Sequence, residues 1–148
     1  MMAENKNFDF KRILVGVDDS ADAILAFRYA INRAKKSGAQ LILCSVLEHD
    51  ETNVYQSLDK DYIHGKRSDL VAHMKKYETI AKKNGVQNVK SVVAEGNAGE
   101  AIVKDVIPHV EPDLLIVGSQ AKKGLARHFG SQAAYMAKYA PISVMVIR

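Results

Sequence analysis

The chain contains one cysteine, Cys44, no tryptophan and no long apolar run. A single thiol cannot form a disulfide within the chain, so the cysteine content fits a reducing compartment. Crossing a bilayer as a helix requires roughly 20 consecutive apolar residues, and no segment approaches that length. The N-terminus lacks the basic segment followed by an apolar stretch that is typical of a signal peptide. These absences predict a cytoplasmic protein that makes no membrane contact.

The charged residues form no dense basic patch. The formal net charge is +4 at pH 7, and the lysine pairs are scattered along the chain. The sequence has no zinc-ligand spacing, and aromatic residues do not alternate with basic ones as they do in single-strand binding proteins. The 5 histidines are widely spread and form no metal-ligand pair. We therefore expect no nucleic-acid partner.

Five short segments, rich in branched apolar residues and bounded by turn-forming residues, have the character of buried β-strands. The second of them contains Cys44, which we interpret as a small buried residue. The predicted strands cover residues 12–18, 40–47, 88–95, 113–118 and 142–147.

Helical patterns separate these strands. Ser20 is a favourable N-cap for a helix that Gly38 ends. Asn97, with Glu100 three residues later, resembles a capping box that opens a short helix through Ile107. The other predicted helices cover residues 66–83 and 131–139, the last of them ending before Pro141.

The alternation of strands and helices predicts an α/β fold. Strands that are apolar on both faces, joined by right-handed helical crossovers, indicate a doubly wound five-stranded parallel sheet in the order 3-2-1-4-5, with helices on both faces. We assign residues 11–148 to this domain and residues 1–10 to a short N-terminal tail. Residues 48–64 lack a clear period, and we interpret them as a loop that merges into the second helix.

The predicted sheet places one loop where ligands bind. In doubly wound sheets the ligand lies outside the carboxyl ends of the strands, at the switch in strand order, and here those ends carry Asp18 and Gly118. Residues 117–132 read VGSQAKKGLARHFGSQ: a strand end, a basic loop, and Gly130-Ser131 at a helix start. Backbone amides and a helix dipole form anion sites in this way. The sequence therefore predicts a phosphate-bearing small molecule, a nucleotide, as the ligand.

The chain resembles the universal stress protein family over nearly its whole length. RILVGVDDS, which includes Asp18 and Ser20, is similar to the opening of that family, and the VGS after the fourth strand is similar to its strand end there. Gly130-Ser131, the helix after it and the terminal APISVMVIR resemble the close of the family. The resemblance implies a regulatory role in the stress response and, as in many members, ATP binding and dimerisation.

The family's ATP motif is altered in this chain. The motif is a glycine, two residues, a second glycine, nine residues, and a glycine with Ser or Thr. Gly118 matches the first position and Gly130-Ser131 the last pair, but Ala121 replaces the second glycine and only the eight residues 122–129 follow it. Alanine at a positive φ costs about 1 kcal/mol. Two alternatives stay open: an ATP-binding regulator, and a dimerisation or signalling module of the same fold that does not bind ATP.

The resemblance also implies which residues contact each part of the nucleotide. These are Gly16, Val17 and Asp18 for the base and ribose, Val46 for the adenine, and Val117, Gly118, Ala121, Gly130, Ser131 and Gln132 for the phosphates and ribose. Lys122 would add positive charge near the phosphates. Asp18 is a candidate ligand for a Mg²⁺ ion that accompanies ATP.

The sequence shows no pair of nucleophile and base arranged for catalysis. The VGS segment lacks the glycine-flanked elbow of hydrolases, and no Gly-Lys-Ser/Thr is present. We expect slow ATP hydrolysis at most. The acidic pair Asp18-Asp19 admits a phosphoacceptor receiver domain as another class. The third predicted strand, however, ends in Glu95, where such a domain needs an aspartate.

The last predicted strand favours self-association. Residues 142–147 lie at the chain end and at the edge of the predicted sheet, and the apolar residues from Ile142 to Ile147 are interrupted only by Ser143. An exposed strand edge invites pairing with a second copy. We therefore predict a two-fold homodimer through this strand, as the family resemblance also implies.

Overall fold

A computed structural model describes residues 9–48, 60–119 and 130–148 of the chain. Its elements, in chain order, are β1 (Arg12–Gly16), α1 (Ala21–Ser37), β2 (Gln40–Leu47), α3 (Lys60–Lys83), β3 (Val89–Glu95), α4 (Ala98–Ala101), the π-helical turn η1 (Ile102–Val106), α5 (Ile107–Val110), β4 (Leu114–Gly118), α6 (Ser131–Tyr139) and β5 (Ser143–Ile147).

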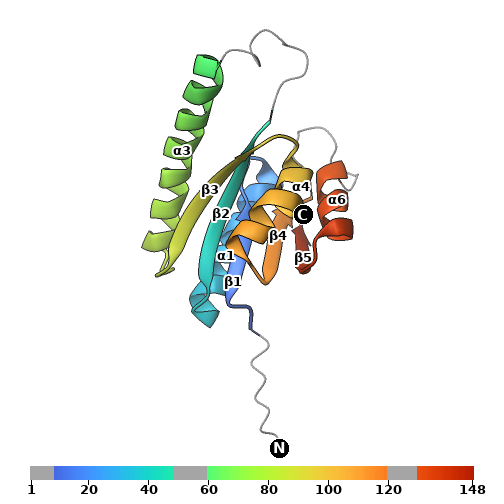
Figure 1. The fold of residues 1–148 in the computed structure, drawn as a ribbon. Coiled ribbons are helices and arrows are strands. Elements are labelled where there is room, and N and C mark those ends of the chain that lie inside the picture. Colours follow the sequence, from blue (N-terminus) through green and yellow to red (C-terminus); the bar gives the residue numbers. More distant parts are fainter. Residues whose placement is uncertain (1–8, 49–59, 120–129) are drawn as a thin grey trace, which may run out of the picture.

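The strands form one parallel sheet in the order β3-β2-β1-β4-β5 (Figure 1). In the centre, Ile13 of β1 lies level with Leu41 of β2 on one side and with Leu114 of β4 on the other. This confirms the predicted doubly wound sheet and its order. From β1 the chain adds β2 and β3 on one side of the sheet, and then β4 and β5 on the other. The switch point in strand order therefore lies between the carboxyl ends of β1 and β4.

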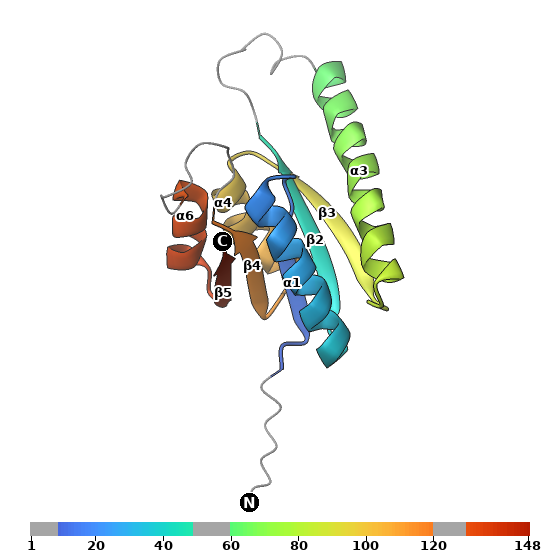
Figure 2. The ribbon, with the colours of Figure 1, turned by 180° about the vertical axis from the view of Figure 1, so that it is seen from behind.

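Helices cover both faces of the sheet, as predicted. Figure 1 shows α4 and α6 in front of the strands, and Figure 2, from behind, shows α1 and α3 over the opposite face. Because side chains alternate along a strand, Ile13 packs under α1 while Leu14 packs on the other side. Both faces are buried, which explains why the central strands are apolar at nearly every position.

Cys44 belongs to the second of these apolar layers. Its side chain is fully buried, and burial raises the pKa of its thiol to about 12. A thiol with so high a pKa stays protonated at neutral pH and is a poor nucleophile. The interpretation of Cys44 as a small buried residue is therefore confirmed.

The residues predicted to cap the helices are found at the helix ends. The Ser20 hydroxyl accepts a hydrogen bond from the Ala23 amide at 3.2 Å, and Gly38 ends α1 with φ of 72°. The Asn97 side chain accepts from the Glu100 amide at 3.4 Å. The Glu100 carboxylate binds Lys104 at 2.8 Å instead of the cap, so the expected capping box forms only in its first half.

Two predicted helix boundaries are wrong. The helix at Asn97 does not end at Ile107 but continues through η1 and α5 to Val110. Pro108 has no amide to donate within a helix, and just before it the Ile107 amide bonds to the carbonyl of Ile102, five residues back, in a widened turn. The long helix α3 begins at Lys60, so residues 60–64 are helical rather than part of the loop. The other residues of that loop, 49–59, lie outside the described part of the chain.

Among the residues that the structure describes, no helix is both long and apolar enough to span a bilayer.

Candidate functional site

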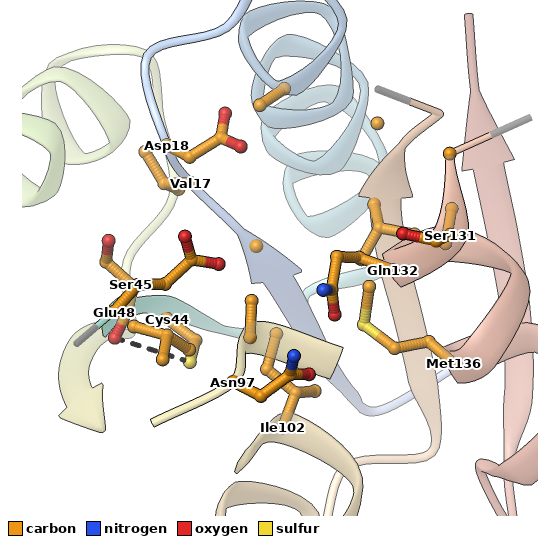
Figure 3. Close-up of a pocket in the computed structure, with 18 of the residues that line it drawn as sticks. Val17, Asp18, Cys44, Ser45, Glu48, Asn97, Ile102, Ser131, Gln132 and Met136 are labelled. Carbon is orange, nitrogen blue, oxygen red and sulfur yellow. Dashed lines mark hydrogen bonds between the residues drawn. The ribbon is translucent and has the colours of Figure 1, made fainter. Parts of the chain in front are cut away.

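A pocket of about 860 Å³ opens at the carboxyl edge of the sheet. Its walls come from the ends of β1, β2 and β4 and from the starts of α4 and α6 (Figure 3). It therefore lies where the switch in strand order predicts a ligand. The predicted site residues that line it are Gly16, Val17, Asp18, Val46, Val117, Gly118, Gly130, Ser131 and Gln132.

Two predicted site residues, Ala121 and Lys122, lie outside the described part of the chain. The altered glycine position and the shortened loop of residues 122–129 fall in the same segment.

The start of α6 offers amide donors to the pocket. Gly130 precedes the helix in extended conformation, and no described side chain caps it. The Gly130 amide donates to the Ser119 carbonyl at 2.8 Å, and the Ala134 amide returns to the Gly130 carbonyl. The first-turn amides of residues 131–133 have no carbonyl four residues back within the helix. With the positive end of the helix dipole, amides of this kind have the donor chemistry that suits an anion.

Gln132 also has a structural contact that the sequence did not predict. It lines the pocket, and its side-chain oxygen accepts a hydrogen bond from the Gly99 amide at 2.7 Å. A Cβ on Gly99 would come to 2.7 Å from that oxygen, so the glycine permits the contact. The Gln132 side chain therefore joins the start of α6 to the start of α4 and holds two walls of the pocket together.

Gly118 allows β4 to approach α1. A Cβ on Gly118 would lie 2.7 Å from the Ala23 amide nitrogen and from the Asp22 carbonyl carbon. Next to it, the buried Ser119 hydroxyl donates to the Asp22 carboxylate at 2.6 Å. These contacts fix the end of β4 against the first turn of α1. The sequence suggested that the missing side chain of Gly118 makes room for a ligand. In the structure it makes room for α1.

The turn after β1 carries two carboxylates with different partners. Oδ1 of Asp18 accepts a hydrogen bond from the Ser20 amide at 2.9 Å, and its exposed side chain borders the pocket. Asp19 has φ of 64°, a left-handed conformation uncommon for a side-chain-bearing residue. Its carboxylate accepts the Tyr77 hydroxyl and lies 3.0 Å from Nε2 of His73. The hydrogen bond from Tyr77, and then that from His73, lower the pKa of Asp19.

Sequence reasoning missed several residues that line the pocket. The charged one is Glu48, which follows β2, and the uncharged polar ones are Asn97, which caps α4 after β3, and the buried Ser45 and Ser119. Ile102 and Met136 supply apolar wall from the helices. Asn97 and Glu48 follow predicted strands, and parallel strands end at one edge of the sheet, so this position could have indicated them. Ile102 and Met136 fit an ordinary core pattern and gave no such signal.

A metal ion in this pocket would need the bound nucleotide to supply most of its coordinating oxygens. Among the described residues no group of three or more His, Cys, Asp or Glu side chains is arranged to hold a metal ion. Magnesium in nucleotide sites is bound by one or two carboxylates together with phosphates and waters. The Asp18 carboxylate fits such a minimal role, with phosphate oxygens supplying the other ligands.

The sheet order, its switch point and the helix start beside it define a doubly wound α/β domain with a pocket at its carboxyl edge. Residues 9–148 match the model of the universal stress protein family, and the chain belongs to that family.

Relatives and solved structures agree with this assignment. The universal stress protein SH1215 of Staphylococcus haemolyticus is 28% identical over 140 residues, which cover 94% of this chain and 85% of that protein. Universal stress protein UspA from Lactobacillus plantarum has a TM-score of 0.78 and 25% identity, over 93% of this chain and 97% of that chain.

Two solved structures with this fold contain nucleotides. A universal stress protein in complex with cAMP has a TM-score of 0.69 and 23% identity, covering 95% of this chain and 98% of that chain. The universal stress protein from Archaeoglobus fulgidus in complex with dAMP has a TM-score of 0.66 and 20% identity, covering 95% and 99% of the two chains.

Proposed function

We propose that this protein binds an adenine nucleotide, ATP with Mg²⁺, in the pocket at the carboxyl edge of the sheet, and that it acts as a cytoplasmic regulatory protein of the stress response. The observation that carries the proposal is the start of α6, which no described side chain caps, beside a pocket of about 860 Å³. The nucleotides named in the cAMP and dAMP complexes of proteins with this fold support it.

The pocket walls match the parts of such a ligand. The phosphates bind the amides at Ser131 and Gln132, where the helix dipole favours negative charge. The ribose lies near Gly16 and Asp18, and the adenine lies against Val46 at the end of β2. Asp18 contributes a carboxylate oxygen to Mg²⁺ bound by the phosphates.

The basic loop completes the proposed phosphate site. Lys122 adds positive charge to a pocket whose described charged residues are Asp18 and Glu48. In this proposal Ala121 is tolerated at the second glycine position, because the amides of α6 supply the principal phosphate contacts.

A proline at the first position of α6 tests the role of the amides. Ser131→Pro removes one N–H, yet proline is favoured at this helical position, and Gly130 already has the extended conformation (φ −60°, ψ 144°) that precedes proline. We expect ATP affinity, measured by titration calorimetry with Mg²⁺, to fall about tenfold or more, the order of one hydrogen bond to a charged group.

The matched control is Ser131→Ala, which removes the hydroxyl and keeps the amide. It should lose less affinity than the proline variant. Equal ATP affinity for wild type and Ser131→Pro would show that the α6 amides do not hold the phosphates. No heat from millimolar ATP with folded wild type would instead favour a module that does not bind ATP.

We also propose that the protein is a two-fold homodimer through β5. Support comes from β5, which is the edge strand of the described sheet, and from its partly exposed apolar residues Val144, Met145, Val146 and Ile147. Pairing of two such edges would satisfy their outward-facing amides and carbonyls.

A further inference from the structure

The pocket has opposite electrostatic character at its two ends. The start of α6 presents amides and the positive end of a helix dipole. Figure 3 shows Asp18 and Glu48 across the pocket from Ser131 and Gln132. Among the lining residues that the structure describes, no lysine, arginine or histidine balances the two carboxylates. A ligand that fits both ends carries an anionic group at α6 and hydrogen-bond donors at its far end.

Within the described part of the chain, the Glu48 carboxylate has no hydrogen-bond donor beside it. Asp18 already accepts the Ser20 amide, which fixes that carboxylate within its own turn. Glu48 is the exposed residue directly after β2, and no group in residues 9–48, 60–119 or 130–148 forms a hydrogen bond or ion pair with its side chain. Its carboxylate is therefore placed to accept a hydrogen bond from a ligand in the pocket.

The sheet topology puts Glu48 at the base end of a bound nucleotide. The strands across the pocket run in the order β2, β1, β4, and α6 follows β4 along the chain. A nucleotide with its phosphates at α6 extends across the ends of β4 and β1, and its base reaches the end of β2, where Val46 and Glu48 lie.

A carboxylate discriminates between base edges because it only accepts hydrogen bonds. Beside an N–H donor it exchanges its bond to water for a bond to the base. Beside a carbonyl oxygen it loses water and gains no partner, which leaves an unsatisfied charge.

We propose that Glu48 is a specificity-determining residue, whose carboxylate accepts a hydrogen bond from the exocyclic amino group of a purine. It thereby selects a 6-aminopurine nucleotide over one with a carbonyl oxygen or a hydrogen at the same position. This inference rests on the proposed nucleotide-binding function, from which it takes the position of the phosphates. It concerns the base alone, so ligands that share their phosphates and differ in the base can test it.

The experiment is titration calorimetry with ATP, ITP and purine riboside 5′-triphosphate. These carry an amino group, a carbonyl oxygen and a hydrogen at the same ring position. Wild type should bind ATP about tenfold more tightly than either analogue, the order of one hydrogen bond to a charged acceptor. In Glu48→Gln the side-chain amide both donates and accepts, so ATP and ITP affinities should come within about twofold of each other.

The matched control is Glu111→Gln. It removes the same charge from a side chain that is 78% exposed and lies just before β4, at the opposite edge of the sheet from the pocket. This variant should keep the wild-type preference. Glu48→Ala, which has no acceptor, should lose ATP affinity without gaining affinity for ITP beyond that of Glu48→Gln.

These titrations distinguish a failure of the role of Glu48 from a failure of nucleotide binding. Equal affinities of wild type for the three nucleotides, or an unchanged preference in Glu48→Gln, would overturn the role of Glu48 and leave nucleotide binding intact. If folded wild type, verified by a cooperative thermal transition, binds none of the three, nucleotide binding itself fails and the role of Glu48 fails with it.

Discussion

Gly118 shows how one residue can serve packing and a ligand site together. It lines the pocket, yet the direction in which a side chain would project leads into the first turn of α1. The sequence indicated a glycine at a strand end and a loop after it, so ligand approach was the natural interpretation. It carried no information that Asp22 and Ala23, far earlier in the chain, would lie beneath that glycine.

The packing role of Gly118 can be tested by measuring the stability of a substituted protein. In Gly118→Ala the new methyl group would lie 2.7 Å from backbone atoms of α1, which cannot move without shifting the helix. We expect the free energy of unfolding to fall by about 1–3 kcal/mol, as for other overpacked sites. Urea denaturation measures the loss.

Gly16→Ala is the matched control, because Gly16 ends the neighbouring strand and lines the same pocket. There a Cβ would lie 3.5 Å from a side-chain carbon of Val117, an ordinary contact, so stability should change little. Equal losses in the two variants would mean that α1 does not press against Gly118.

At the scale of elements, Tyr77 holds α3 to the turn that follows β1, beside the pocket. The Tyr77 ring packs edge-on against Phe27 of α1 with centroids 5.0 Å apart, and its hydroxyl donates to Asp19, beside the pocket residue Asp18. His73, one turn earlier, meets the same carboxylate. The left-handed backbone at Asp19 is thus stabilised by a helix that lies outside the pocket.

Tyr77→Phe keeps the ring contact and removes the hydroxyl, so it should lower the free energy of unfolding at pH 7 by about 0.5–1 kcal/mol, a modest value because Asp19 is largely exposed. The loss should depend on pH. The pKa of Asp19 is lowered in the folded protein, so its stabilising contribution is present above the ordinary aspartate pKa of about 3.9. That contribution disappears as pH falls through the lowered pKa, and the difference between variant and wild type should shrink there.

Tyr29→Phe provides the control for acid conditions. The Tyr29 hydroxyl accepts from Arg33 at 3.1 Å, and arginine keeps its charge throughout the acid range. Its effect, measured by urea denaturation at the same pH values, should stay constant through the titration of Asp19. A Tyr77→Phe penalty that persists unchanged in acid would contradict the role assigned to the Asp19 carboxylate.

The elements that the sequence predicted well are those with strong local signals. Apolar strands flanked by turn residues, together with caps such as Ser20 and Gly38, were sufficient for the strand order and for both ends of α1. The start of α3 was missed because residues 60–64 carry no apolar period. Pro108 suggested a helix end, whereas the bond between Ile107 and Ile102 lets the helix continue past it. Most of the predicted pocket residues line one cavity because they lie at the carboxyl ends of strands or at the start of α6. Side-chain links such as that of Gln132 to Gly99 depend instead on tertiary structure.

At the scale of the whole molecule, the backbone of β5 determines how a second copy can pair. The Ile147 carbonyl accepts from the Ser119 amide, so the polar groups of Ile147 face β4. Successive residues of a strand direct their amides and carbonyls to opposite sides, so those of Val144 and Val146 face the free edge. A partner strand would bind these groups.

Val144→Pro therefore removes an outward amide while the bonds between β5 and β4 remain, a placement that edge strands tolerate. We expect light scattering at micromolar concentration to give the mass of two chains for wild type and of one chain for this variant. Val144→Thr keeps the amide and the branched side chain, and it should remain a dimer. A wild type with the mass of one chain, or a proline variant that stays paired, would rule out dimerisation through this edge.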